Sequence, residues 1–374
     1  MPRLPPSLFR KASDFGPNVS RLLPVCRDIP SAQNELRWLD EHATHLVKKS
    51  RHEDRKTCLR RLVTRRAQGE PLQYILGSEY FGDLQIQCRT GVLIPRPDTA
   101  ASISHLVSLM SHSGPVSSSS KRLKVLDLCT GSGCIPLLFH HEFYKRVLNR
   151  TKKIDLVGVD ISKKALALSK HNQRLQLEAP PRCDVADSPR LHSLSNIRFI
   201  AGDVLKDAGE ADNVCNALYQ VWGDEDALTC DVLLSNPPYV SSKSFRTVTA
   251  PSVRHYEPKL ALVPSCLTNS DQVADGDAFY PKILNLAKQL ESNIILLEVA
   301  DIEQAVRVAS MAMEQSLWAG VEIWRDEPDG DSLQLTQIDV NGSRVTVKGS
   351  GHGRSVFAYR REGSKWLGLS HDSY

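Results

Sequence analysis

From Leu123 onward the chain alternates short apolar β-type segments with helical ones, and this alternation constrains the fold more than any other feature of the sequence. The β-type segments include KVLDL, IDLVGVD, NIRFIAGDV, DVLLS and NIILLEV, while KKALALSKHNQRLQL and KILNLAKQL are amphipathic. Such alternation is typical of a parallel, doubly wound sheet with helices on both faces. Two later segments, SLQLTQIDV and RSVFAYRR, predict an antiparallel pair that closes this α/β sheet.

The residues before this pattern predict a helical domain over residues 1–80. SAQNELRWLDEHATHLV spaces its apolar residues three or four apart, and KTCLRRLVTRRAQG repeats that spacing. Gly69 and Pro71 end the second helical stretch. Its arginines, Arg60, Arg61, Arg65 and Arg66, form either a solvated face or a contact for an acidic or RNA-bearing partner.

A β-hairpin is predicted between the two parts, over residues 81–100. Leu84, Ile86 and Cys88 alternate with polar residues, Thr90 and Gly91 can turn, and 92–94 returns. The α/β domain then occupies residues 101–374. Two spacers, near 175–196 and 206–229, interrupt its pattern and are interpreted as loops inserted at the surface.

Composition excludes several classes of protein. No apolar run is long enough to cross a bilayer, so no membrane association is expected. The nine cysteines include no Cys-x-x-Cys pair, which predicts a reducing compartment and no metal site. A net charge of +4 is too mild for a dedicated reader of duplex DNA, so direct sequence-specific nucleic acid binding is not expected.

The first residues resemble an organellar targeting segment. Arg3, Arg10 and Lys11 precede the first acid, Asp14, although three early prolines oppose the helix that such signals form. We predict a mitochondrial location, with the cytoplasm as the alternative.

A glycine-containing turn follows the first predicted strand of the sheet. VLDLCTGSG leads from a strand into a helix through Cys129, Thr130, Gly131, Ser132 and Gly133. Glycine lets the backbone approach a ligand closely, as in nucleotide-binding folds, but the full G-x-G-x-x-G pattern is absent. The turn therefore predicts a nucleotide-like ligand only in combination with other features.

Acids at the ends of the next two strands supply those features. Asp160, followed by Ile161, ends the second strand, where a carboxylate can bind two ribose hydroxyls. Asp203, with Val204, ends the third strand and is placed to border an adenine ring. A glycine turn followed by these acids suits S-adenosylmethionine, which carries ribose, adenine and a sulfonium but no phosphate.

The fourth strand ends in Asn236-Pro237-Pro238-Tyr239, which we interpret as the catalytic motif. Prolines fix φ and donate no hydrogen bond, so the pair makes a stiff turn at the ligand-binding edge of the sheet. The Asn236 side-chain oxygen and the Pro237 carbonyl can then each accept one N–H of a planar –NH₂ group, while Tyr239 packs on the group that bears it. Both bonds strengthen as positive charge develops on the nitrogen during methyl transfer, which favours the transition state.

The motif is shared by methyltransferases that act on adenine N6 and on the glutamine amide, so other segments must choose between them. GEPLQYILGSEYFGDLQIQCRTGVLIPRPDT closely resembles the junction segment of the PrmC/HemK family of glutamine N5-methyltransferases, and YEPKLAL, GDAFYPKIL and LEV resemble later segments of that family. The order of features matches over nearly the whole chain. Cys129 departs from the pattern, because the family usually has glycine there.

The resemblance implies a Rossmann-like class I S-adenosylmethionine-dependent methyltransferase with an N-terminal helical domain and a connecting hairpin. It implies methylation of the glutamine in the Gly-Gly-Gln motif of a class I peptide-chain release factor. It also places Tyr74 and Arg96 in the junction, where each either shapes the pocket or packs. Two alternatives stay open: a DNA or RNA adenine-N6 methyltransferase, and a non-catalytic S-adenosylmethionine-binding assembly partner.

Overall fold

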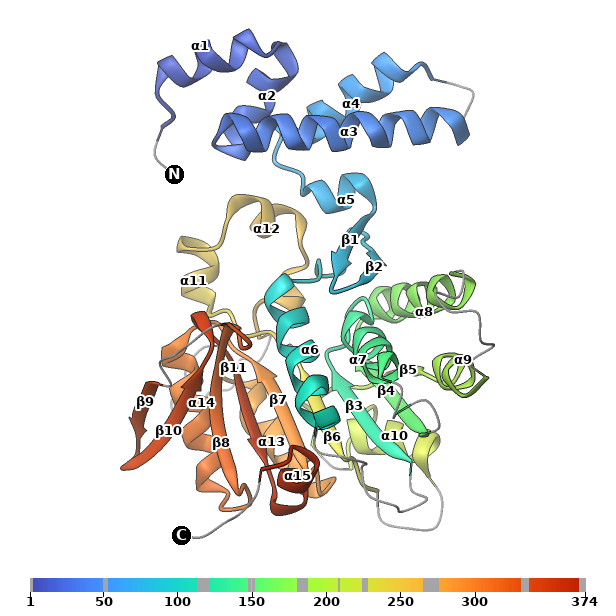
Figure 1. Ribbon diagram of the computed structural model, residues 1–374, viewed down its shortest axis with the longest axis vertical. Helices are drawn as coiled ribbons and strands as arrows, with labels where there is room; N and C mark the ends of the chain where they lie inside the picture. Colours follow the sequence, from blue (N-terminus) through green and yellow to red (C-terminus); the bar gives the residue numbers. More distant parts are fainter. Residues whose placement is uncertain are drawn as a thin grey trace.

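Figure 1 shows a group of N-terminal helices set apart from a large α/β body, with a small hairpin between them. The computed structural model describes residues 3–49, 53–112, 122–146, 149, 152–179, 188–207, 209–223, 228–264, 276–330 and 336–369. Within these ranges no helix has both the length and the apolar character needed to cross a membrane.

Five helices open the chain: α1 (Pro6–Asp14), α2 (Pro17–Cys26), α3 (Ile29–Lys49), α4 (Arg55–Ala67) and α5 (Leu72–Leu76). α1 and α2 begin at prolines, whose missing N–H costs nothing in the first turn, and Asp54 caps α4 by accepting a hydrogen bond from the N–H of Thr57. The apolar stripes of α2, α3 and α4 meet in a small core of their own around Leu22, Leu39 and Leu62.

The arginines of α4 are mostly paired within the protein. Arg61 pairs with Glu53, Arg65 with Glu70, and Arg66 with Glu35 at 2.6 Å. Their charge is therefore largely neutralised inside the helical group, which favours the interpretation without an RNA-bearing or acidic partner at this face.

The hairpin lies one strand earlier in the sequence than predicted. Its strands are β1 (Ser78–Phe81) and β2 (Leu84–Gln87), and the turn is at Gly82 and Asp83. Residues 92–94 form no strand and instead line the cavity described below. The prediction was wrong because β2 alternates equally well with a strand on either side, and Gly82-Asp83 makes the shorter connection.

A nine-stranded sheet forms the body, in the order β5-β4-β3-β6-β7-β11-β8-β10-β9. Five parallel strands come first: β3 (Leu123–Leu128), β4 (Ile154–Asp160), β5 (Arg198–Ala201), β6 (Val232–Ser235) and β7 (Ile294–Glu298). β11 (Ser350–Tyr359) is antiparallel to both β7 and β8 (Gly320–Glu327). β10 (Ser343–Lys348) runs parallel to β8, and β9 (Thr336–Val340) is antiparallel to β10.

Helices cover both faces of the sheet, as the alternation predicted (Figure 1). Successive residues of one strand enter different cores: Val125 packs in one and Leu126 in the other. The first core includes side chains of α6 (Pro97–His112) and α7 (Cys134–Lys145), with α8 (Lys163–Glu178) beside them. The second includes those of α10 (Val214–Trp222), α13 (Phe279–Gln289) and α14 (Ile302–Glu314).

Short helices complete the body. They are α9 (Ser188–Ser195), α11 (Ser242–Thr247), α12 (Pro251–Tyr256), the 3₁₀ turn Lys259–Ala261 and α15 (Arg361–Trp366). α11 and α12 follow the Asn-Pro-Pro-Tyr motif and lie between the body and the N-terminal helices (Figure 1). The Tyr256 hydroxyl donates to the carbonyl of Gln68, which joins α12 to the end of α4.

The two predicted inserted loops each contain a helix that packs on the core. α9 falls in the first and buries Leu194; α10 falls in the second and buries Val214 and Leu218. α10 is the crossover between the parallel strands β5 and β6, which need such a connection. Residues 180–187, 208 and 224–227 of these spacers lie outside the described residues.

The predicted closing pair of strands was wrong in its pairing. β9 lies within the first predicted segment and β11 overlaps the second, but the two strands do not pair with each other, and residues 332–335 lie outside the described residues. β8 and β10, which the sequence analysis missed, pair with each other and separate them. Half of the residues of β8, GVEIWRDE, are charged, so its apolar run is too short to stand out.

Candidate active site

The candidate site lies where the sheet order reverses, at the carboxyl ends of β3 and β6. These strands are neighbours, but β4 and β5 extend the sheet on the side of β3, and β7 extends it on the side of β6. Connections on the two sides diverge at such a point and leave a crevice above the strand ends. Ser235 Oγ donates a 2.9 Å hydrogen bond to the Leu128 carbonyl, which ties the ends of the two strands together.

The turn after β3 has three residues with positive φ, and only two of them are glycines. Cys129, Gly131 and Gly133 all have positive φ, at 61°, 55° and 77°. A Cβ at Gly133 would lie 2.8 Å from the Ser169 side chain, so glycine is needed there for close packing of α7 and α8. Cys129 therefore holds a left-handed conformation that favours glycine.

Asp160 joins the end of β4 to this turn. Its Oδ2 accepts a 2.8 Å hydrogen bond from the N–H of Gly131, and its Oδ1 accepts one of 2.8 Å from the N–H of Ser162. Burial raises the pKa of the carboxyl above its usual range, and the backbone N–H donors oppose that rise. The carboxylate thus orders the turn and borders the cavity at the same time.

The other strand end on this side carries the predicted adenine neighbours. Asp203 follows β5, and its Oδ1 accepts a hydrogen bond from the N–H of Leu205. Val204 is buried beside it, whereas Ile161, across the opening, keeps 55% of its surface exposed. An apolar side chain left exposed at the mouth of a cavity fits the flat face of a base.

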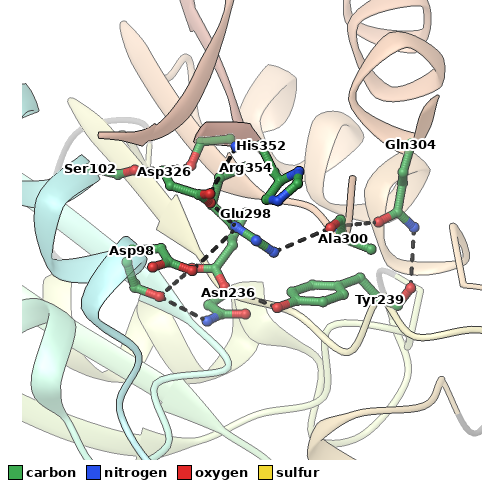
Figure 2. Close-up of polar contacts among 12 residues, drawn as sticks. Asp98, Ser102, Asn236, Tyr239, Glu298, Ala300, Gln304, Asp326, His352 and Arg354 are labelled. Carbon is green, nitrogen blue, oxygen red and sulfur yellow. Dashed lines mark hydrogen bonds and ion pairs between the residues drawn. The ribbon is translucent and has the colours of Figure 1, made fainter. Parts of the chain in front are cut away.

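The Asn-Pro-Pro-Tyr motif leaves β6 directly, and its members differ in what they face. Asn236 and Pro238 line the cavity, whereas Pro237 and Tyr239 are not among the lining residues. Asn236 Nδ2 donates to Thr99 Oγ1 at 3.4 Å. Figure 2 shows the Asn236 side chain turned so that its nitrogen faces this hydroxyl and its oxygen points away.

Tyr239 is held against the body by both ends of the residue. Its ring packs on the second core, its hydroxyl donates to Glu298 Oε1 at 3.0 Å, and its carbonyl accepts from Gln304 Nε2 at 3.2 Å (Figure 2). Burial, together with the Glu298 charge, raises the pKa of the phenol, so Tyr239 stays neutral.

One cavity brings most of the predicted site residues together. The predicted residues that line it are Cys129, Thr130, Gly131, Ser132, Asp160, Ile161, Asp203, Val204, Asn236 and Pro238. Gly133 is outside the lining and is the N-cap residue that precedes α7. The junction supplies Arg96 to the wall, paired with Glu257 at 2.7 Å, whereas the Tyr74 hydroxyl is buried and donates to the Val92 carbonyl. Arg96 thus shapes the pocket and Tyr74 packs.

The structure adds Asp127 and Glu298, two buried carboxylates that the sequence analysis did not single out. Asp127 lies in β3, fully buried and outside the cavity lining; neither of its oxygens has a hydrogen bond of normal geometry among the described residues, although the nearby Thr130 hydroxyl opposes the rise in its pKa that burial causes. The hydroxyls of Thr130 and Ser132 are also buried without partners there. An acid inside an apolar strand, directly before a glycine turn, was the signal that could have identified Asp127.

These unsatisfied groups fit the methionine part of S-adenosylmethionine. Burial raises the pKa of the Asp127 carboxyl, because the charged form is not solvated. A nearby cation stabilises that charged form, and the ammonium group of an amino acid is such a cation. Two hydroxyls beside it can donate to the accompanying carboxylate. The donor set at the turn therefore matches the charges of the cofactor's amino-acid end.

Comparison with known proteins agrees with this chemistry. Residues 23–77 match the family model of the PrmC N-terminal domain. The chain is 32% identical to a probable mitochondrial N(5)-glutamine methyltransferase of Schizosaccharomyces pombe, over 80% of this chain and 87% of that protein. It is 31% identical to a mitochondrial N(5)-glutamine methyltransferase of Saccharomyces cerevisiae, over 93% and 91%.

A bacterial relative extends the match. The release factor glutamine methyltransferase of Thermodesulfovibrio yellowstonii is 28% identical, over 75% of this chain and 80% of that protein. The predicted fold class, enzyme class and cofactor are confirmed by these findings together with the observed sheet. The chain belongs to the PrmC/HemK family of release factor glutamine methyltransferases, which are enzymes with a Rossmann-like, S-adenosylmethionine-dependent fold.

Proposed function

We propose that this chain methylates the side-chain amide N5 of the glutamine in the Gly-Gly-Gln motif of a class I peptide-chain release factor, and that it does so in mitochondria. The observation that carries the proposal is the orientation of Asn236 at the cavity wall. Its nitrogen is engaged by Thr99, so its oxygen is left to accept an N–H from a planar amide. Two yeast relatives are named as mitochondrial glutamine methyltransferases, which supports the compartment.

The residues divide between holding the cofactor and holding the amide. Thr130, Gly131, Ser132 and Asp127 hold the amino-acid end, while Cys129 borders it. Asp160 accepts from ribose hydroxyls, and Ile161, Asp203 and Val204 enclose the base. When bound, S-adenosylmethionine supplies an electrophilic methyl group on a sulfonium.

The amide is held by the Asn-Pro-Pro-Tyr turn. The Asn236 oxygen and the Pro237 carbonyl each accept one amide N–H, and Pro238 and Tyr239 fix the turn that presents them. Fixing both N–H groups directs the amide nitrogen at the methyl and stabilises the charge that develops on it. The extra proton leaves to water, so no strong base is required.

The N-terminal helices are proposed to contact the release factor away from the reacting loop. A single glutamine offers little area, and further contact supplies the affinity that the amide site lacks. We propose that residues 1–80 form this recognition domain, joined by residues 81–100 to the catalytic domain at 101–374.

The test is methyl transfer from labelled S-adenosylmethionine to purified mitochondrial and cytosolic release factors, each beside its Gly-Gly-Gln to Gly-Gly-Ala variant. Label on the mitochondrial factor that is lost in its variant is the expected result. Label on DNA or RNA instead would replace the proposal by the adenine alternative. Cofactor binding without transfer to any of them would favour the non-catalytic assembly partner.

A further inference from the structure

Behind the Asn-Pro-Pro-Tyr turn lies a buried carboxylate, Glu298, that does not itself line the cavity. It ends β7, keeps 5% of its surface exposed, and is not among the cavity-lining residues. Its Oε2 accepts a short hydrogen bond from Thr99 Oγ1 of α6, and its Oε1 accepts one of 3.0 Å from the Tyr239 hydroxyl. One carboxylate therefore contacts both Tyr239 of the motif and Thr99, the hydrogen-bond partner of Asn236 (Figure 2).

The direction of these bonds follows from the chemistry of the groups. An ionised carboxylate can only accept, so the single proton of the Thr99 hydroxyl must point to Glu298. The Thr99 oxygen is then left as an acceptor, and the group that donates to it, at 3.4 Å, is Asn236 Nδ2. The Asn236 amide is consequently fixed with Nδ2 toward Thr99 and Oδ1 free.

A second brace acts on the same loop through Gln304. Its Nε2 donates to the Tyr239 carbonyl, and its Oε1 accepts a 2.7 Å bond from the N–H of Ala300. Tyr239 is thus held at the hydroxyl by Glu298 and at the backbone by Gln304. The Asn236 side chain could still rotate by 180° and exchange its oxygen and nitrogen. The hydrogen bonds from Thr99 to Glu298 and from Asn236 to Thr99 prevent that rotation.

We infer that Glu298 is a positioning residue for methyl transfer: through Thr99 it fixes the Asn236 side chain with its oxygen toward the substrate amide. An Asn236 amide flipped by 180° would present –NH₂ to the –NH₂ of the substrate, two donors facing each other, and would hold nothing. Glu298 therefore acts on the rate of transfer and not on the affinity for the cofactor. The inference rests on the proposed function where it names the substrate amide, whereas the orientation of Asn236 follows from the hydrogen bonds alone.

The kinetic test compares Glu298→Gln and Thr99→Val with the wild-type enzyme, using a purified mitochondrial release factor and S-adenosylmethionine. We expect each substitution to lower kcat roughly ten- to hundredfold and to leave the KM for S-adenosylmethionine within about threefold. Glu322→Gln is the matched control, since Glu322 is also a carboxylate in the sheet but lies on β8, which β11 separates from β7, and is bound to Trp324 Nε1 and Lys348.

A double-variant test separates positioning from a merely structural role. In an Asn236→Ala background, Glu298→Gln should lower kcat no further, because the group that it positions is already gone. A further loss equal to that in the wild-type background would overturn the inference. Thr99→Val in the same background answers the same question if Glu298→Gln does not fold.

A third readout needs no substrate protein. With asparagine-selective ¹⁵N labelling and S-adenosylhomocysteine bound, the Asn236 side-chain –NH₂ resonances are assigned by their loss in Asn236→Ala. They should shift in both Thr99→Val and Glu298→Gln and stay in place in Glu322→Gln. Unchanged resonances in Glu298→Gln would overturn the inference, even if the enzyme methylates some other substrate. If the resonances shift but the wild-type enzyme is inactive on release factors, only the proposed function is contradicted.

Discussion

The backbone N–H of Gly131 donates a 2.8 Å hydrogen bond to Oδ2 of Asp160, so the acid at the end of β4 closes the glycine turn that follows β3. The two residues are far apart in the sequence and meet because β3 and β4 are parallel neighbours. Asp160 is consequently both a boundary of the cofactor cavity and a support for the turn.

Replacing this acid should weaken cofactor binding. In Asp160→Asn only one oxygen remains as an acceptor. The new –NH₂ group then faces a backbone N–H and cannot accept a hydrogen bond from it. Hydrogen bonds to a charged group contribute about 1.5–3 kcal/mol, so we expect affinity for S-adenosylhomocysteine to fall roughly ten- to hundredfold, measured by calorimetry. Asp155→Asn, at the start of the same strand and paired with Arg122, is the control that should bind normally. Equal affinities of the two variants would contradict this role.

Removing the proposed amide acceptor should affect the reaction itself. Asn236→Ala deletes one of the two groups that stabilise developing charge, and such deletions lower rates by about 10²–10³. Single-turnover methylation of the release factor measures this loss directly. Asn216→Ala, on the exposed side of α10, removes an asparagine side chain that donates to the Glu210 carbonyl, and should retain the full rate. A wild-type rate in Asn236→Ala would remove Asn236 from the mechanism.

The rate should also fall on the acid side as Glu298 takes up a proton. Burial raises the pKa of Glu298 above its ordinary value, so the ionised form is lost as pH falls through that raised pKa. A protonated carboxyl donates as well as accepts, and the direction of the Thr99 bond is then no longer fixed. The charged and titratable groups around Glu298 are Asp98, Arg96, Cys134, Tyr239, Tyr280 and Arg354.

The pH dependence of kcat distinguishes Glu298 from its neighbours. Burial raises the pKa values of Cys134, Tyr239 and Tyr280, so these groups stay neutral throughout the acid range. The charge of Asp98 raises the pKa of Glu298, so Asp98→Asn should keep the acid limb and move it to lower pH. Glu298→Gln should abolish the limb. An unchanged limb in Glu298→Gln would assign it to another group.

Cys129 offers a test of backbone strain at the cofactor turn. With φ at 61°, any residue with a Cβ is strained there by about 1–2 kcal/mol, so Cys129→Gly should be about 1 kcal/mol more stable than Cys129→Ala in urea unfolding. The same pair at the buried Cys58, inside α4, should show the opposite order by about 1 kcal/mol, because glycine is the poorer helix former. A Cys129→Ala variant as stable as Cys129→Gly, or more stable, would mean that Cys129 is not strained.

The sequence predicted those parts of the molecule that depend on local pattern. The alternation after Leu123 determined the parallel part of the sheet, and the residues at its strand ends, such as Asp160 and Asn236, meet because parallel strands end at one edge. Pairing between distant segments could not be read in the same way. β8 pairs only with strands that come later in the chain, β10 and β11, and neither β8 nor β10 has an apolar run of its own that exceeds its charged residues.

The network behind the site was hidden for a related reason. Thr99 and Glu298 are 199 positions apart, and nothing in either local segment marks them as partners. Asp127 carried a local signal, an acid inside an apolar strand before a glycine turn, but its full burial was visible only in the structure. Cys129, by contrast, was noted from the sequence as a departure at a glycine position, and its left-handed backbone gives that departure a physical meaning.

Gly276 lies against the backbone of the Asn-Pro-Pro-Tyr motif. Its substitution should therefore lower both the stability of the protein and the rate of methyl transfer. Its φ is 115°, and a Cβ there would lie 2.8 Å from the Tyr239 carbonyl and 3.3 Å from the N–H of Ser241. Because that carbonyl is also the acceptor for Gln304, it cannot move without loss of a partly buried hydrogen bond. Gly276→Ala therefore adds a steric clash to the ordinary cost of a left-handed alanine.

Gly16→Ala separates those two costs. Gly16 has a similar φ of 103°, but a Cβ there would meet no atom within 4 Å. We expect Gly16→Ala to lower the free energy of unfolding by about 1–2 kcal/mol, and Gly276→Ala to lower it by about 2 kcal/mol more, since the partly buried hydrogen bond from Gln304 is strained as well. Urea unfolding followed by tryptophan fluorescence measures both. Methylation should also slow in Gly276→Ala alone, because displacement of the Tyr239 backbone moves the turn that presents Asn236, whereas equal losses of stability and unchanged rates would show that the loop relaxes around the added methyl group.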